Sequence, residues 1–234
     1  MILAAEGVNH AYGGQRVLEQ VSLVVQSGET LAIVGRSGCG KTTLLRILAG
    51  FIKPDGGAVT LDGSPVDAPD KDRWMVFQSF DQLFPWFTLR RNLTFALRKT
   101  RPWISGREAR VIAGECLAQM GLEDAGDKYP YQLSGGMQQR GALARAMAVA
   151  PKALLMDEPF SSLDVLSRES ARGALATLAA ATGAAVVIVT HDLEEAAALG
   201  TRIALMKAET RGIFAMVENQ GPDVGERLRR LMGD

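Results

Sequence analysis

The most constraining feature of this 234-residue sequence is a glycine-rich stretch at 35–43 that reads GRSGCGKTT. It fits the pattern G-x-x-x-x-G-K-[ST], with Gly35, Gly40, Lys41 and Thr42 at the fixed positions. Glycines let consecutive backbone N–H groups curl around a phosphate without a clash from a Cβ atom. The stretch therefore predicts a loop that binds phosphate.

The residues on both sides of this loop provide the context that it requires. The apolar run at 31–34 predicts a buried strand, and the run at 44–49 predicts a helix whose N-terminus adds partial positive charge at the loop. Lys41 can reach the β- and γ-phosphates of a nucleotide, and the Thr42 hydroxyl can ligate Mg²⁺. The nucleotide-binding candidates are Gly35, Ser37, Gly38, Cys39, Gly40, Lys41, Thr42 and Thr43.

Composition and charge exclude several classes of protein. The chain is 47% hydrophobic with a formal net charge of +0. This composition predicts a globular fold and does not indicate a polyanion-binding surface. Its two cysteines, Cys39 and Cys116, form no disulfide framework and suit a reducing cytoplasm. The first residues lack the features of a signal peptide, and the uncharged run at 173–190 favours a weak helix and a strand over a membrane span. We therefore expect a soluble chain that takes any membrane role through a partner.

Hydrophobic patterning divides the chain into β-rich and helical portions. β-type patterning runs through 1–28, and helical patterning at 89–122 forms an insertion between two β-rich portions. The tail predicts a short strand and a basic amphipathic helix near 226–231. Further short strands are predicted at 57–63, 74–77, 153–156, 186–189 and 202–206.

Polar side chains directly follow several of these strands, where ligand-binding groups gather in open α/β sheets. Gln78 is able to ligate Mg²⁺ or hold a water, and Asp157 suits Mg²⁺ coordination through water. Glu158 suits orienting or polarising an attacking water. His191 is either a structural histidine or a sensor of the γ-phosphate.

A second glycine motif, LSGGM at 133–137, begins another predicted helix. Ser134 is its N-cap, and Gly135 and Gly136 are costly in a first helical turn. The motif is either an ordinary capped helix or a helix start whose bare N–H groups let a phosphate approach. We favour the second interpretation, although one nucleotide does not need two such loops from the same chain. The residues alone therefore do not say which phosphate the motif would bind.

Two aromatic features are each compatible with two roles. Tyr12 either stacks on a purine or is a strand-end aromatic. The segment at 80–87, which reads FDQLFPWF, either packs in the core or forms a partially exposed hydrophobic groove for a partner helix.

Together these motifs resemble the ATP-binding subunit of an ABC transporter over nearly the whole chain. The motifs that follow the family's order are the phosphate loop, Gln78, LSGGM, Asp157–Glu158, SSLD at 161–164 and His191. The resemblance implies an α/β fold in which a P-loop, RecA-like core with a mostly parallel sheet carries an antiparallel β subdomain and an inserted α-helical subdomain. We expect the core with its β subdomain at 1–78 and 151–234, and the helical subdomain at about 79–150.

The resemblance also implies how the motifs act together. ATP would lie between one subunit's phosphate loop and Ser134, Gly135 and Gly136 of a second copy, in an ATP-dependent head-to-tail homodimer. Tyr12 looks like the adenine-stacking aromatic, and Asp164 like the aspartate that crosses the dimer interface. The implied catalytic residues are Glu158, His191, Lys41 and Gln78. The implied Mg²⁺ ligands are Thr42, Gln78 and Asp157.

Two details favour an importer. Met137 stands where the family-wide signature has glutamine, and methionine is common at that place in importer subunits. The segment after Gln78 is similar to importers of nitrate, sulfonates, taurine and related small solutes, and also to thiamine-precursor importers. We expect an ATPase at the cytoplasmic face of a bacterial inner membrane, with transmembrane permease subunits as partners and a periplasmic solute-binding protein acting indirectly. The alternatives are an exporter subunit and, with less support because no coiled coil or nucleic-acid domain is present, a DNA-repair ATPase; no nucleic-acid partner is expected.

Overall fold

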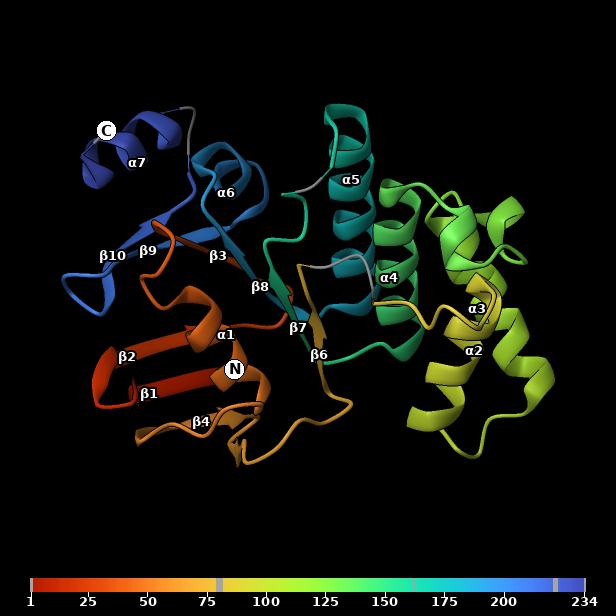
Figure 1. Cartoon of the computed structure of the whole chain (residues 1–234), viewed down its shortest axis with the longest axis horizontal. Helices are drawn as coiled ribbons and strands as arrows, with labels where there is room; N and C mark the ends of the chain where they lie inside the picture. The colour runs from red at the N-terminus through yellow and green to blue at the C-terminus, as the bar shows by residue number, and fades with distance from the viewer. Residues whose placement is uncertain (1, 79–81, 162, 221–222, 234) are drawn as a thin grey trace. The chain divides into compact units, whose positions relative to one another are not determined.

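The computed structural model describes residues 2–78, 82–161, 163–220 and 223–233, and Figure 1 shows the whole chain. Two compact units make up the chain. The core unit comprises Met1–Met75, Lys152–Glu158 and Ala184–Asp234, and the helical unit comprises Val76–Pro151 and Pro159–Gly183. No helix among the described residues is both long and apolar enough to cross a membrane.

The core unit contains a six-stranded sheet whose strand order is β10-β9-β3-β8-β7-β6. Strands β9, β3, β8 and β7 are parallel to one another, and β10 pairs antiparallel with β9. The strands are β3 (Thr30–Val34), β6 (Arg73–Val76), β7 (Ala153–Asp157), β8 (Ala185–Thr190), β9 (Arg202–Lys207) and β10 (Gly212–Glu218). The carboxyl ends of β3, β7 and β8 therefore meet at one edge of the sheet, as parallel pairing requires.

Alternate side chains of β3 pack on opposite faces of this sheet. Leu31 and Ile33 pack in a core with α1 (Lys41–Ala49), whereas Ala32 and Val34 pack in a second core with α6 (Leu193–Leu199) and α7 (Val224–Met232). Because strand side chains alternate between faces, a strand covered on both sides must be apolar throughout, which explains the run LAIV. Burial of β3 on both faces thus fixes where the loop after it begins.

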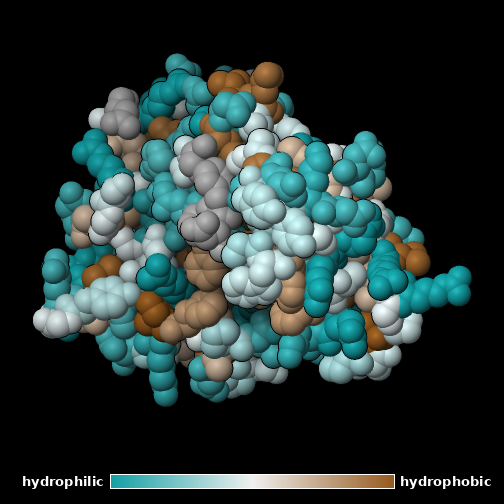
Figure 2. Space-filling view, turned by 45° about the vertical axis from the view of Figure 1, so that its right-hand side comes forward, coloured by the Kyte–Doolittle hydropathy of each residue, from teal (hydrophilic) through white to brown (hydrophobic). Residues whose placement is uncertain are grey.

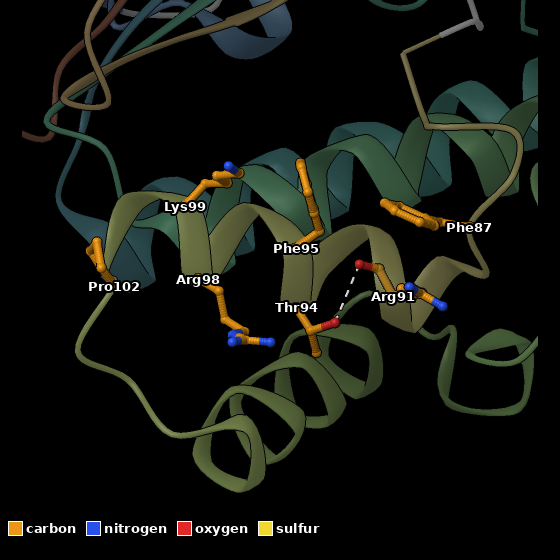
Figure 3. A pocket seen from close by; sticks show the side chains of 7 residues that line it. All are labelled: Phe87, Arg91, Thr94, Phe95, Arg98, Lys99 and Pro102. Carbon is orange, nitrogen blue, oxygen red and sulfur yellow. Dashed lines mark hydrogen bonds between the residues drawn. The ribbon is translucent and has the colours of Figure 1, made fainter.

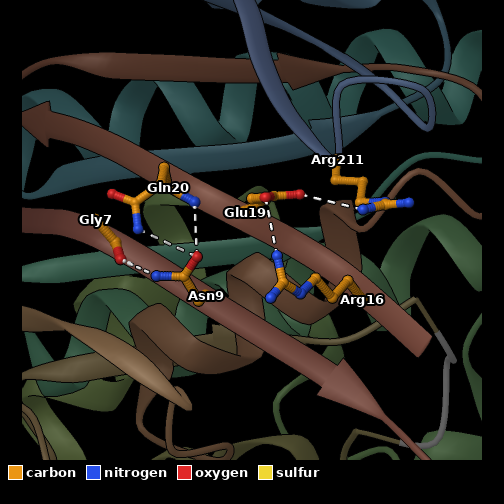
Figure 4. A network of polar contacts seen from close by, with 6 residues as sticks. All are labelled: Gly7, Asn9, Arg16, Glu19, Gln20 and Arg211. Carbon is orange, nitrogen blue, oxygen red and sulfur yellow. Dashed lines mark hydrogen bonds and ion pairs between the residues drawn. The ribbon is translucent and has the colours of Figure 1, made fainter. Parts of the chain in front are cut away.

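A second sheet in the core unit is antiparallel, with the strand order β2-β1-β4-β5. Its strands are β1 (Leu3–Tyr12), β2 (Gln15–Val25), β4 (Gly56–Leu61) and β5 (Ser64–Pro65). The β1–β2 pairing changes register between Ala5 and Val8, and there Asn9 accepts from the backbone N–H of Gln20 at 3.0 Å and donates to the Gly7 carbonyl at 2.6 Å (Figure 4). These bonds satisfy backbone groups that the irregular register leaves out of the ladder.

A surface ion pair links this antiparallel sheet to the larger one. Glu19 of β2 lies 3.0 Å from Arg16 and 3.2 Å from Arg211, which belongs to the turn between β9 and β10 (Figure 4). The backbone N–H of Glu19 also donates to the Arg211 carbonyl at 2.9 Å. Strand β2, which carries Val17, is therefore tied to the β9–β10 hairpin.

The helical unit consists of α-helices joined by short turns. Its elements are α2 (Leu89–Thr100), α3 (Gly106–Gln119), η1 (Glu123–Ala125), η2 (Pro130–Gln132), α4 (Gly135–Val149) and α5 (Val165–Thr182). Side-chain oxygens of Thr88, Ser105, Ser134 and Asp164 cap α2, α3, α4 and α5 respectively. Each helix thus begins at a residue whose side chain satisfies an otherwise unpaired N–H group.

A single buried asparagine organises the start of this unit. Asn92 of α2 has no exposed surface, and its carbonyl oxygen accepts from the Phe84 backbone N–H at 2.7 Å. Its NH₂ group donates to the carbonyls of Phe84, Phe87 and Thr88 at 3.1 to 3.2 Å. One side chain therefore pins the turn that leads into α2 and orders the aromatic residues around it.

The aromatic segment at 80–87 is partly buried and partly exposed, and its role as a groove for a partner helix stays a prediction. Leu83 is buried, Phe84 and Phe87 are half-buried, and Trp86 is 66% exposed. The rings of Phe84, Phe87 and Phe95 lie 5.3 to 5.9 Å apart, so they pack on one another while remaining partly exposed. Phe80 and Asp81 of the predicted segment lie outside the described residues.

The α/β fold class, the mostly parallel sheet and the separate antiparallel sheet are confirmed. Helix α5 was predicted only in part, because the sequence indicated a weak helix from residue 173 and α5 begins at Val165. Helix α6 was not predicted. The structure also groups Pro159–Gly183 with the helical unit, whereas the sequence predicted 151–234 for the core. The face seen in Figure 2 is mostly hydrophilic, and hydrophobic residues appear on it in small groups.

Replacement of Asn92 tests whether this side chain holds the helical unit together. Asn92→Ala removes the side-chain partner of the Phe84 N–H and of the Phe87 carbonyl, while the Phe84 and Thr88 carbonyls keep their bonds to the backbone N–H groups of Phe87 and Asn92. We expect the free energy of unfolding to fall by about 3 kcal/mol, because two partly buried backbone groups lose their partners. Urea unfolding measures it. Thr94→Ala is the control, because its hydroxyl makes only an exposed bond to Arg91, and it should change stability by less than about 0.5 kcal/mol. Equal effects of the two substitutions would contradict this account.

Candidate active site

A cavity of about 410 Å³ lies in the core unit at the carboxyl end of β3. Because the loop and the strand ends are parts of one unit, the fold itself brings these residues together. The lining residues are Tyr12, Val17, Ser37, Gly38, Gly40, Lys41, Thr42, Thr43 and Glu158. Eight of these nine were predicted as site residues, and Val17 was not.

The glycine loop ends at Gly40, where the neighbouring strand leaves no room for a side chain. Gly40 has a φ of 102°, and a Cβ atom there would lie 2.9 Å from Leu18 and 3.1 Å from the Val17 carbonyl. Gly40 is also the N-cap of α1, so the loop turns into the helix at a residue that only glycine suits. Antiparallel strand β2 therefore packs directly against the loop, which the motif alone does not reveal.

Lys41 is buried and spans its own loop. Its Nζ donates to the carbonyl of Gly35 at 2.7 Å and to that of Arg36 at 3.1 Å. These carbonyls satisfy the ammonium group inside the fold, where an unpaired charge would be costly. The lysine therefore holds the two ends of the loop together and keeps a positive charge beside the loop's backbone N–H groups.

Thr42 and Asp157 bring two oxygen donors together from sequence-distant elements. The Thr42 hydroxyl, in the first turn of α1, donates to Asp157 Oδ1 at 3.0 Å at the end of β7. Burial raises the pKa of Asp157 above its ordinary value, and the Thr42 hydrogen bond opposes this shift. A hydroxyl and a carboxylate in contact suit Mg²⁺, which is usually held by one or two carboxylates together with phosphate oxygens. No cluster of three or more His, Cys, Asp or Glu side chains that could hold a metal ion occurs in the part of the chain that the structure describes.

Glu158 and His191 form a pair beside the loop. Glu158 Oε2 lies 3.2 Å from His191 Nδ1, and the two side chains are 18% and 56% exposed. Glu158 has a φ of 43°, in the left-handed region that a residue with a side chain rarely adopts, and its backbone N–H donates to the Val189 carbonyl at 2.9 Å. Backbone strain of this kind collects at functional sites, where the surrounding structure holds it in place.

Three residues around His191 position its turn and were not singled out from the sequence. The Thr190 hydroxyl donates to the buried carboxylate of Glu195 and accepts from the Asp192 backbone N–H at 3.0 Å. Asp192 in turn caps α6 by accepting from the N–H groups of Glu194 and Glu195. The signal available in the sequence was an Asp three residues before a Glu at the start of an apolar stretch, which resembles a helix N-cap.

Tyr12 lies at the end of β1 and is 49% exposed. Its ring meets the His10 ring edge to face, with centroids 4.7 Å apart. The tyrosine lines the same cavity as the loop, so it is placed where a flat ring bound there could contact it. Purine stacking by Tyr12 stays a prediction.

Cys39 is buried within the loop, with 2% of its surface exposed. Burial raises the pKa of its thiol, and the nearby charge of Lys41 opposes the shift. The group is therefore held as a thiol, which is the unreactive form.

Five predicted site residues belong to the helical unit: Gln78, Ser134, Gly135, Gly136 and Asp164. Their roles at the nucleotide stay predictions. Gln78 follows Phe77, whose backbone N–H and carbonyl both bond to the Gln82 side chain, at 3.1 and 2.7 Å. The Gln82 side chain therefore fixes the backbone of the residue before Gln78, a role that the sequence did not suggest.

The glycine motif at 133–137 has a structural reason beside the predicted one. Ser134 caps α4 as predicted, accepting from the Met137 N–H at 3.3 Å. A Cβ atom at Gly136 would lie 2.7 Å from the Ser167 side chain, so Gly136 allows α4 and α5 to approach closely. Asp164 caps α5 by accepting from the Ser167 N–H at 2.9 Å, and this bond lowers the pKa of its carboxyl. Ser162, in the SSLD loop, lies outside the described residues.

Comparisons with known proteins agree with this geometry. A family model described as ABC transporter matches residues 18–161. The taurine import ATP-binding protein TauB of Mesorhizobium japonicum is 46% identical, with 99% of this chain and 91% of that protein covered. The nitrate import ATP-binding protein NrtD of Synechococcus elongatus is 42% identical, with 81% and 69% covered. A dimeric ATP-binding cassette solved in a post-hydrolysis state with ADP and Pi superposes with a TM-score of 0.78 at 33% identity, covering 94% of this chain and all of that one.

Substitution of Asp157 tests the electrostatic cost of this carboxylate. The pKa of Asp157 is higher in the folded chain than in the unfolded chain, so its ionised carboxylate destabilises the fold at neutral pH. Below the unfolded-state pKa the carboxyl is protonated in both states, and this destabilisation disappears. We expect nucleotide-free Asp157→Asn to melt at a higher temperature than the wild type at pH 7, and the gap to close as the pH falls to about 4. Thermal denaturation across this range measures it.

The same substitution should reverse its effect when Mg-ATP is added. The wild type should gain more thermal stability from Mg-ATP than Asp157→Asn, because a ligand stabilises the fold that binds it more tightly. Asp192→Asn is the control, since that carboxylate caps α6 and does not contact Thr42. An Asp157→Asn protein that is less stable at pH 7 and responds normally to Mg-ATP would contradict the assignment.

Proposed function

This chain belongs to the ABC transporter family and is an ATP-binding ATPase subunit, and on that premise we propose that it powers uptake of a small solute across a bacterial inner membrane. The solute class we propose is a small sulfonate or inorganic anion, in line with the names of the taurine and nitrate import proteins that it resembles. The proposed location is the cytoplasmic face of the membrane, where the chain is held by permease subunits.

The observation that carries the proposal is the grouping of Lys41, Thr42, Asp157, Glu158 and His191 at one end of the core sheet. The loop's N–H groups and Lys41 would bind the β- and γ-phosphates. Mg²⁺ bound to the Thr42 hydroxyl and, through water, to Asp157 would neutralise charge on the phosphates. These roles fit the contacts that Lys41, Thr42 and Asp157 make in the fold.

Glu158 has the geometry of a general base. Its carboxylate lines the cavity, is largely shielded from water, and is held by the His191 imidazole on one oxygen. We propose that it accepts the proton of a water that attacks the γ-phosphate, while His191 orients the carboxylate and contacts the phosphate. The strained backbone at Glu158 aims the side chain, because its φ of 43° turns the chain sharply after β7.

The partners we propose follow from the motifs that the core unit does not use. Ser134, Gly135 and Gly136 would bind the γ-phosphate held by a second copy, and Asp164 would contact that copy, in an ATP-dependent head-to-tail dimer. The related cassette was solved as a dimer. Gln78 would touch Mg²⁺ or the attacking water and relay to the permease, and a periplasmic solute-binding protein would deliver the solute to the permease. No nucleic acid takes part.

Copurification tests the direction of transport. A tag on this chain in its native membrane should recover a permease and a periplasmic solute-binding protein, and transport assays with that binding protein identify the solute. Recovery of a permease with an exporter's architecture would overturn import while leaving the ATPase intact. Recovery of no permease, with ATP hydrolysis stimulated by DNA, would overturn the transport function.

Replacement of the proposed base should separate binding from hydrolysis. We expect Glu158→Gln to lower kcat by at least about 100-fold, because a positioned general base contributes about 10²–10⁴-fold. ATP binding should persist, and size exclusion with Mg-ATP should show a trapped dimer. Glu218→Gln, an exposed carboxylate on β10, is the matched control and should hydrolyse ATP normally. Normal turnover in Glu158→Gln would refute the proposed role.

A further inference from the structure

A buried histidine lies beside the nucleotide cavity and has no part in the proposed chemistry. His10 of β1 is 9% exposed, and its ring meets the ring of Tyr12 edge to face, with the two planes at 89°. Neither ring nitrogen of His10 makes a hydrogen bond to the residues that the structure describes. Because burying an unbonded polar ring costs stability, the stability of the fold gives no reason for a histidine here.

The backbone of Tyr12 is fixed by a tight turn. Tyr12 pairs with Gln15 across the turn that joins β1 to β2, and the two turn residues, Gly13 and Gly14, have φ of 54° and 86°. Positive φ at both positions is the mark of the two-residue turn that suits a hairpin. The turn sets where the ring of Tyr12 begins. It does not set the rotamer of this ring, which is 49% exposed.

The contact with His10 restricts that rotamer. An exposed ring loses rotational freedom when a ligand stacks on it, and this loss weakens binding. A ring that already packs edge to face on a neighbour, here with centroids 4.7 Å apart, loses less of this freedom. Since Tyr12 lines the same cavity as the glycine loop, the His10 contact prepares one wall of the cavity for a flat ligand.

Asp55, in the segment before β4, holds His10 in turn. Its backbone N–H donates to the Asn9 carbonyl at 2.8 Å, and its carboxylate accepts from the Ala11 N–H at 2.7 Å. The same carboxylate oxygen, Oδ2, lies 3.4 Å from His10 Nδ1. Asp55 therefore ties down the backbone on both sides of His10 and places its carboxylate against the imidazole.

We propose that His10 is a positioning residue for the nucleotide base. It holds the Tyr12 ring in the orientation that stacks on the base, and Asp55 holds His10. The proposal rests on the proposed function, since stacking by Tyr12 is itself a prediction. A histidine that only supported β1 would change the stability of the fold and leave recognition of the base unaltered.

Calorimetric titration of the full chain with Mg²⁺ and a non-hydrolysable ATP analogue tests the effect on affinity. We expect His10→Ala to weaken binding by about fivefold, equivalent to about 1 kcal/mol, the size of an edge-to-face ring contact. Magnesium tripolyphosphate has no base, so its affinity should change by less than about twofold. Hydrolysis of ATP should show a raised KM and an unchanged kcat, because the residues around the phosphates are untouched.

A double-mutant cycle shows whether His10 acts through Tyr12. Tyr12→Ala should weaken binding of the analogue by about fivefold or more, because it removes the stacking ring. Adding His10→Ala to Tyr12→Ala should then cost less than about twofold, since the ring that His10 positions is already gone. Independent, additive losses would show that His10 acts by another route and would overturn the proposal.

Two further variants separate positioning from general support of the strand. His10→Phe keeps a ring in place and should bind the analogue within about twofold of the wild type. Asn9 lies on the same strand, and its side chain bonds to Gly7 and Gln20 (Figure 4). Asn9→Ala should lower the melting temperature but change the affinity by less than about twofold. Equal losses of affinity in Asn9→Ala and His10→Ala, or an equal loss of tripolyphosphate binding in His10→Ala, would contradict positioning.

Failure of this proposal and failure of the proposed function give different results. If Tyr12→Ala binds the analogue like the wild type, the tyrosine does not stack and positioning by His10 is wrong, whereas hydrolysis by the wild type would still support the proposed function. If Glu158→Gln turns over normally while His10→Ala still weakens binding of the analogue alone, the role of His10 stands and the proposed base is what fails.

Discussion

The backbone path of the glycine loop is the constraint on which the rest of the core unit depends. The loop leaves a strand that is buried on both faces and enters α1 at Gly40, where β2 leaves no room for a Cβ atom. Lys41 ties the loop to itself, and Thr42 ties the first turn of α1 to the end of β7. These contacts place the loop, the Lys41 cation and the Thr42 hydroxyl at one cavity, with the Asp157 carboxylate bonded to that hydroxyl, so the proposed phosphate site needs no large rearrangement of these residues.

The opposite side of the cavity depends on strain and on buried hydrogen bonds. Glu158 keeps a left-handed backbone conformation because its N–H is bonded to Val189 on the neighbouring strand. The turn that carries His191 is held by Thr190, Asp192 and Glu195, which lie outside the motif itself. A rigid turn on each of two adjacent strands brings the carboxylate and the imidazole within 3.2 Å. Such preorganisation suits a group that must hold a water in one orientation.

The helical unit is held by a buried side-chain hydrogen-bond network and by close packing of its helices. The Asn92 side chain bonds to backbone groups of the turn before α2, and Gly136, within the LSGGM motif, lets α4 and α5 approach closely. The aromatic segment is half core and half surface, because Leu83 is buried while Trp86 is exposed. A groove along α2 collects positive charge that the neutral composition of the chain conceals. Its lining residues include Phe87, Arg91, Phe95, Arg98 and Lys99 (Figure 3). Local charge, rather than net charge, is what a partner at this surface would meet.

By itself, the sequence determined the fold class, the position of the phosphate loop and most of the residues that line its cavity. It could do so because the loop motif and the apolar strands before Asp157 and His191 are local patterns, and parallel pairing brings the ends of such strands together. Only the tertiary structure decided the contacts of Val17 and Leu18 with Gly40, of Gln82 with Phe77 and of Ser167 with Gly136. It also decided that α5 begins at Val165. These depend on how elements pack, and packing distances have no signature in a single sequence.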